Sequence, residues 1–176
     1  MAQSFERLYQ VYGRFVLALG MVAGAAVFAI MWLIDANVLM RKLFNQPVTG
    51  TLEITEGALV LIIFLGLAFT QRRRGHIRVT LMTRHFPKWL RDVLYVLVLL
   101  IGAGLCAWYT WAAYTYALRS YNINEMEWGV LIFQVWPIKA AVALGWGLLS
   151  VQFLLDAVRH IFVAKGQLEL VEGEEV

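Results

Sequence analysis

The chain has 176 residues, of which 61% are hydrophobic and 15% are charged, whereas about 25% are charged in a typical soluble domain. This composition excludes an ordinary soluble protein and predicts an all-α integral membrane protein. Because the net charge is only +3, the placement of lysine and arginine is more informative than their sum.

The first predicted transmembrane span covers residues 15–34. These 20 residues carry no charge and, as a helix, would measure about 30 Å, the thickness of a hydrocarbon core. The run is longer than the apolar part of a signal peptide and no A-x-A cleavage site follows, so we expect an uncleaved helix. Residues 4–14 and 35–50 alternate apolar and basic positions at helical spacing, which predicts amphipathic helices lying at the membrane interface.

The second and third spans are predicted at about residues 54–71 and 93–118. The uncharged part of the second span, residues 57–70, would measure only about 21 Å, so either Glu56 enters the membrane edge or protein shelters this helix. The third span has 26 uncharged residues, about 39 Å, and must tilt or project beyond the lipid.

The fourth span is predicted at residues 137–155. A single helix from Trp128 would contain Pro137 in its interior, whereas proline favours the first turn of a helix. The helix is therefore expected to begin at Pro137, with residues 128–136 as an apolar segment at the interface, where tryptophan is enriched. The acidic tail, residues 165–176, lacks apolar periodicity and is predicted to be frayed.

The positive charges are divided unequally by these four spans. Eleven lysines and arginines lie with the two termini and the loop between the second and third spans, and three lie on the opposite side. The positive-inside tendency then predicts that both termini face the cytoplasm.

The loop from Gln71 to Asp92 carries seven of the fifteen basic residues. A short loop pressed against a membrane offers no folded base-reading face, so we expect no nucleic-acid partner. Contact with anionic lipids and fixation of the topology account better for the charge. The predicted lipid or topology anchors are Arg72, Arg73, Arg84, Lys88, Trp89, Arg91 and Lys139, the last in the first turn of the fourth span.

Residues for catalysis or cofactor binding are not apparent. His76, His85 and His160 lie outside the spans, so the axial ligand pair of a membrane haem protein is missing, and the common hydrolase and phosphate-loop motifs are absent. We therefore expect no enzyme activity, no cofactor and no metal. Glu53 and Glu56 open the second span, where they either interact with the helix dipole or form an ion pair across a subunit interface.

Several short motifs nevertheless occur in a characteristic order. The chain reads "RKLFNQP" from Arg41, then Glu53 and Glu56 open a helix containing "FLGLAF", then "RRRGHIRV" and Pro87 follow. This order, on a four-span plan, resembles the small membrane subunit of tripartite ATP-independent periplasmic (TRAP) transporters, the DctQ-like family. The matching positions are Arg41, Phe44, Asn45, Pro47, Glu53, Gly66, Gly75, His76, Ile77 and Val79, and the chain departs from the pattern at Gly50 and Thr80.

The resemblance implies a subunit of a three-component importer in the bacterial cytoplasmic membrane. In such systems a periplasmic solute-binding protein captures an organic anion, and a large membrane subunit, which binds sodium, moves it by an elevator motion. The small subunit is expected to brace the large one and to help dock the binding protein, without catalysis. The candidate contacts to partner subunits are Arg41, Asn45, Glu53, Glu56, Arg74, His76 and Arg78.

Two other functions remain open from the sequence. One is the membrane anchor of a redox enzyme complex, against which the missing intramembrane histidines argue. The other is a self-contained four-helix transporter, for which we find neither broken helix pairs nor inverted repeats.

Overall fold

The computed structural model describes residues 2–73 and 87–164. They form four helices, α1 (Ala2–Phe44), α2 (Thr51–Arg72), α4 (Lys88–Asn122) and α5 (Trp136–Ala164). Each of the four contains a stretch long and apolar enough to cross a membrane. The predicted all-α fold with four spans is therefore confirmed.

Helix α1 differs from the prediction because it is one continuous helix of 43 residues, about 65 Å long. The segments 4–14 and 35–44 are thus not separate interfacial helices, and that part of the prediction was wrong. Residues 35–44 contain neither glycine nor proline, so nothing local interrupts the helix before Phe44. Asn45 then ends it with a left-handed φ of 52°, a conformation that asparagine tolerates well.

A short turn, residues 45–50, returns the chain from α1 to α2. The Val48 N–H donates to Asn37 Oδ1 at 2.8 Å, and the Thr51 hydroxyl donates to the Val48 carbonyl. Gly50 has a φ of 78°, and a Cβ at this position would overlap the side chain of Leu131. Glycine therefore allows both the turn and the close approach of the loop that contains Leu131.

Helix α5 begins at Trp136, one residue before the predicted start of the fourth span, and Pro137 lies in its first turn. Residues 123–135 precede it as an extended loop that folds back on itself. The Glu127 N–H donates to the Phe133 carbonyl at 2.9 Å and the Val135 N–H donates to the Glu125 carbonyl at 3.1 Å. This apolar segment is therefore separate from the fourth span, as expected.

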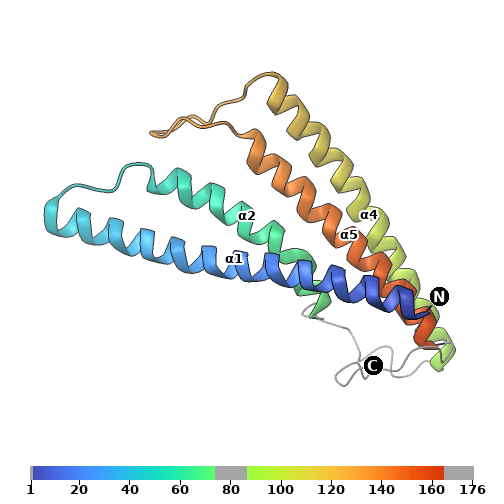
Figure 1. The fold of residues 1–176 in the computed structure, drawn as a ribbon. Coiled ribbons are helices and arrows are strands. Elements are labelled where there is room, and N and C mark those ends of the chain that lie inside the picture. Colours follow the sequence, from blue (N-terminus) through green and yellow to red (C-terminus); the bar gives the residue numbers. More distant parts are fainter. Residues whose placement is uncertain (1, 74–86, 165–176) are drawn as a thin grey trace.

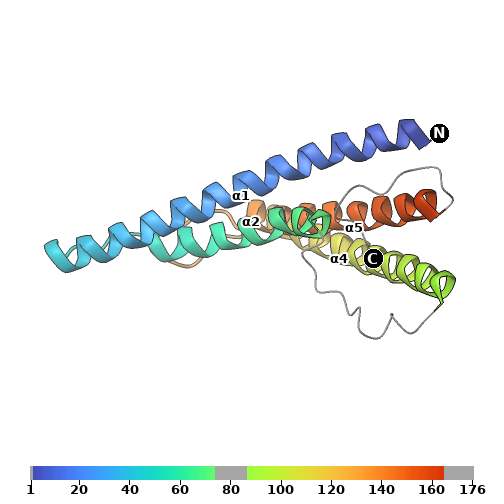
Figure 2. The same ribbon diagram turned by 90° about the horizontal axis from the view of Figure 1, so that it is seen from below.

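The helices converge at one end and spread apart at the other (Figure 1). The start of α1, the start of α4 and the end of α5 lie at this end of the molecule in both views, and Figure 2 shows α1 and α4 diverging on either side of α5 there. Helix α5 packs against α4 and α2, and α1 packs against α2. Of the four spans α5 is the most buried, with small side chains such as Ala141, Ala143 and Ala157 in the interior. It is the central helix of the bundle.

Candidate functional site

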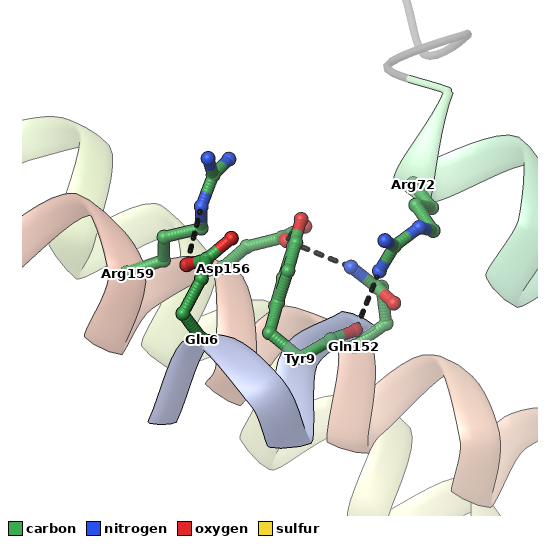
Figure 3. A network of polar contacts seen from close by, with 6 residues as sticks. All are labelled: Glu6, Tyr9, Arg72, Gln152, Asp156 and Arg159. Atoms are coloured by element: carbon green, nitrogen blue, oxygen red, sulfur yellow. Dashed lines mark hydrogen bonds and ion pairs between the residues drawn. The ribbon is translucent and has the colours of Figure 1, made fainter. Parts of the chain in front are cut away.

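A polar network joins α1, α2 and α5 at the converging end of the bundle (Figure 3). Its centre is the carboxylate of Asp156 on α5. The Tyr9 hydroxyl and the Gln152 amide donate to its Oδ1 at 3.1 and 2.7 Å, and the Gln71 amide donates to its Oδ2 at 3.2 Å. Three donors from three helices thus hold one carboxylate.

Two arginines enclose the ring of Tyr9 in this network. The guanidinium carbons of Arg72 and Arg159 lie 4.4 and 4.9 Å from the ring centroid, within the range of cation–π attraction. Arg72 also donates from Nη1 to the Tyr9 carbonyl at 3.1 Å, and Arg159 Nε lies 3.6 Å from Glu6 Oε2. The start of α1 is therefore fixed to α2 and α5 by both charge and hydrogen bonding.

The network is partly buried: Gln152 is fully buried, Tyr9 is 8% exposed and Arg159 is 7% exposed. Asp156, Arg72 and Glu6 are half-buried at its edge. Asp156 accepts from three donors, whereas Gln152 Oε1 and Glu6 Oε2 are buried without a hydrogen-bond partner among the described residues. The shared acceptor favours a single arrangement of the helices around it. Among the described residues no group of three histidines, cysteines or carboxylates could hold a metal ion. We interpret the network as a structural lock on the bundle.

This network was not among the features predicted from the sequence. The available signal was the spacing of Gln152 and Asp156, which lie four residues apart and therefore on one face of a helix that is otherwise apolar there.

A second polar contact at the same end was also missed. His160 Nε2 on α5 lies 3.3 Å from Asp92 Oδ1 on α4, and the ring of Tyr95 lies against the imidazole at 4.7 Å.

Glu53 is engaged within the chain at the opposite end of the molecule. Its Oε1 accepts the Val130 N–H at 2.7 Å, so the carboxylate ties the start of α2 to the loop 123–135. Glu56, three residues further along α2, is exposed. Arg41 and Asn45 are exposed at the end of α1. The structure thus distinguishes the two glutamates, for which the sequence predicted the same alternative roles.

Lys139 is engaged as well. Its ammonium forms an ion pair with Glu125 at 2.5 Å, joining the first turn of α5 to the loop before it. The hydrogen bond from Lys139 lowers the pKa of the Glu125 carboxyl below its ordinary value. The predicted role of Lys139 as a lipid anchor remains a proposal, and the observed contact is with protein.

The predicted anchors near the basic loop have different surroundings. Arg72 contacts Tyr9, whereas Arg73 is exposed, with its guanidinium 5.5 Å from the Phe69 ring centroid. Trp89 is 67% exposed and Arg91 is half-buried, both in the first turns of α4. Four other predicted residues lie outside the described residues, namely Arg74, His76, Arg78 and Arg84. The description of Lys88 covers its backbone in α4 and does not extend to its side chain.

Comparison with known proteins identifies a matching family. A family model described as "Tripartite ATP-independent periplasmic transporters, DctQ component" matches residues 30–163. The matched range contains Gln71, Arg72, Gln152, Asp156 and Arg159, and it begins after Glu6 and Tyr9. No curated protein matches the chain.

Proposed function

The chain belongs to the DctQ component family of TRAP transporters, and on that premise we propose that it is the non-catalytic small subunit of a sodium-driven organic-acid importer. In this role it braces the large membrane subunit, which binds the substrate anion and sodium, and helps dock the periplasmic binding protein. Both termini face the cytoplasm, a proposal supported by the distribution of lysine and arginine.

The far end of α1 carries the observation that most favours a bracing role. A helix of about 65 Å is roughly twice as long as a hydrocarbon core, so part of it lies at or beyond the membrane surface. The last turns contain Asp35, Arg41 and Lys42, which favour the surface, yet Leu43 and Phe44 are 68% and 64% exposed. Exposed apolar side chains outside the lipid are typical of a surface that a protein partner covers.

Co-purification tests this proposal. A tagged chain extracted in mild detergent should carry a large multi-span subunit with it, and the double variant Leu43→Gln, Phe44→Gln should recover less of that subunit. Equal amounts of the chain in the membrane control for insertion. Recovery of the wild-type chain alone would contradict the proposal.

The residues His76 and Arg78, which the family pattern places after the second span, allow a separate test by uptake. Replacement of both by alanine should reduce substrate uptake while membrane insertion is unchanged, because the neighbouring arginines suffice for topology. Arg84→Ala in the same loop is the matched control for loss of charge. Normal uptake in the double variant would leave lipid anchoring as the function of this loop.

A further inference from the structure

A pocket of about 420 Å³ opens between α1 and α2 near the converging end of the bundle. It is lined by Gln10, Gly13, Arg14, Leu17, Phe69, Arg72 and Arg73. Three of these seven residues are arginines and none is acidic. The net positive charge of the lining selects for an anionic occupant.

The position of the pocket along the helices indicates its depth in the membrane. Arg14 directly precedes the uncharged residues 15–34, and Arg72 and Arg73 follow the uncharged residues 57–70. The three guanidiniums therefore lie together where two apolar segments end, at the level of lipid headgroups. Leu17 and Phe69 lie about one turn deeper and give the pocket an apolar inner wall.

Gly13 and Tyr9 determine where the guanidinium of Arg72 lies. Arg72 Nη1 donates to the Tyr9 carbonyl at 3.1 Å, and a Cβ at position 13 would overlap the guanidinium. Glycine at this position thus leaves space for the charge to lie between the helices. The side chains of Arg14 and Arg73 are exposed at the mouth of the pocket.

We propose that this pocket binds the phosphate of an anionic phospholipid, with the guanidiniums of Arg14, Arg72 and Arg73 around the headgroup. Guanidinium donors match phosphate oxygens in pairs, and basic pockets between membrane helices are suited to anionic headgroups. The start of one acyl chain lies along Leu17 and Phe69. A soluble phosphate would gain no favourable contact from this apolar wall, so we assign the site to a lipid. The proposal depends on the membrane location and is independent of the transport role.

Lipid retention measured by native mass spectrometry tests the site. The full chain, with any membrane subunit that co-purifies, is titrated in neutral detergent with phosphatidylglycerol or with phosphatidylcholine of the same acyl chains. We expect a preference for phosphatidylglycerol on the order of tenfold. Arg14→Gln and Arg73→Gln should each weaken retention of phosphatidylglycerol about fivefold, because each removes one basic contact at the headgroup.

Arg7→Gln is the matched control for Arg14→Gln. Arg7 is exposed on α1, seven residues or about two turns before Arg14, so it lies on the same face without lining the pocket. Its replacement removes the same charge and should leave lipid retention unchanged. Leu17→Trp adds bulk to the apolar wall without a change of charge and should weaken retention of the lipid as the arginine variants do.

Several results would overturn the assignment. Equal losses in Arg7→Gln and Arg14→Gln would indicate general surface charge, and the absence of a headgroup preference would remove the basis for an anionic site. Displacement of phosphatidylglycerol by millimolar inorganic phosphate would identify a soluble phosphate site. Exclusion of the lipid when a large subunit is bound would mean that a surface of the partner, and not a lipid, covers the pocket in the complex.

Discussion

The hydroxyl of Tyr9 on the first helix donates to the carboxylate of Asp156 on the last helix at 3.1 Å, across 147 positions of the chain. Gln71 at the end of α2 donates to the same carboxylate. One side chain thus fixes three helices at the end of the bundle where they converge, while their other ends spread apart (Figure 1). A bundle in which one carboxylate joins three helices would suit the proposed role of bracing a larger subunit.

Replacing Asp156 by alanine should destabilise the bundle. Tyr9, Gln71 and Gln152 would lose their common acceptor, and unsatisfied buried donors cost about 1–3 kcal/mol each. We expect the unfolding free energy in detergent to fall by about 2 kcal/mol or more, measured by chemical denaturation. Asp35→Ala removes an exposed carboxylate and is the control. An Asp156→Ala protein as stable as the wild type would show that the network is not a lock.

Two variants of Tyr9 separate its hydroxyl from its ring. Tyr9→Phe loses the hydrogen bond to Asp156 and keeps the ring between Arg72 and Arg159, at a cost of about 1 kcal/mol. Tyr9→Leu also loses both cation–π contacts and should cost a further ~0.5–2 kcal/mol. Denaturation curves of the two variants compare these losses. Equal stability of the two would mean that the arginines contribute nothing through the ring.

Two helical glycines should respond in opposite ways to replacement by alanine. A Cβ on Gly145 in α5 would lie 2.5 Å from the Phe64 carbonyl oxygen, a backbone atom that moves only if α2 and α5 separate. Gly145→Ala should therefore destabilise the chain by about 1–3 kcal/mol. Gly66 in α2 has open space around its Cβ position, so Gly66→Ala should be neutral or stabilising by up to about 1 kcal/mol. Thermal unfolding of both proteins checks this order, and the reverse order would refute the packing described for α2 and α5.

Acid should weaken the attachment of the loop 123–135 to α5. The pKa of Glu125 is lowered in the folded chain by the hydrogen bond from Lys139, so this contact stabilises the fold above the ordinary carboxyl pKa. The stabilisation is lost as the pH falls through the lowered pKa, below about 4.5. Hydrogen exchange of the loop amides, corrected for intrinsic pH dependence, should show less protection at pH 3 than at pH 6. In Lys139→Gln this pH dependence should shrink, and an unchanged profile would show that another group titrates.

The sequence predicted the all-α fold and the number of spans because their causes are local. The spans follow from four apolar runs, of which the fourth has Lys139 in its first turn, and from the preference of Pro137 for a helix start. No distant contact is needed to recognise them. The continuity of α1 was missed for a different reason. Residues 35–44 have an amphipathic pattern, which is shared by a separate interfacial helix and by the extension of a spanning helix.

The polar network could not be predicted in the same way. Tyr9, Gln71 and Asp156 are distant in the sequence, and only the crossing of three helices brings them together. Arg72 and Arg73 likewise read as two equivalent anchors, yet Arg72 bonds to Tyr9 while Arg73 is exposed. The orientation of α2 relative to α1 places Arg72 against Tyr9 and leaves Arg73 exposed. This orientation depends on the tertiary structure.

Glu53 and Glu56 offer the sharpest test of the structure at the opposite end. Glu53 accepts the Val130 N–H, whereas Glu56 is exposed, although both open the same helix. Glu53→Ala should free the loop 123–135 and increase the exchange of the Val130 amide severalfold, while Glu56→Ala leaves it unchanged. Glu53→Gln retains an acceptor oxygen and should restore most of the protection.

If the loop is also a docking surface for the binding protein, Glu53→Ala should weaken binding of that protein with no loss of the large subunit. Equal exchange in all three variants would mean that the carboxylate of Glu53 does not hold the loop, and its role would then have to be sought in contacts with a partner.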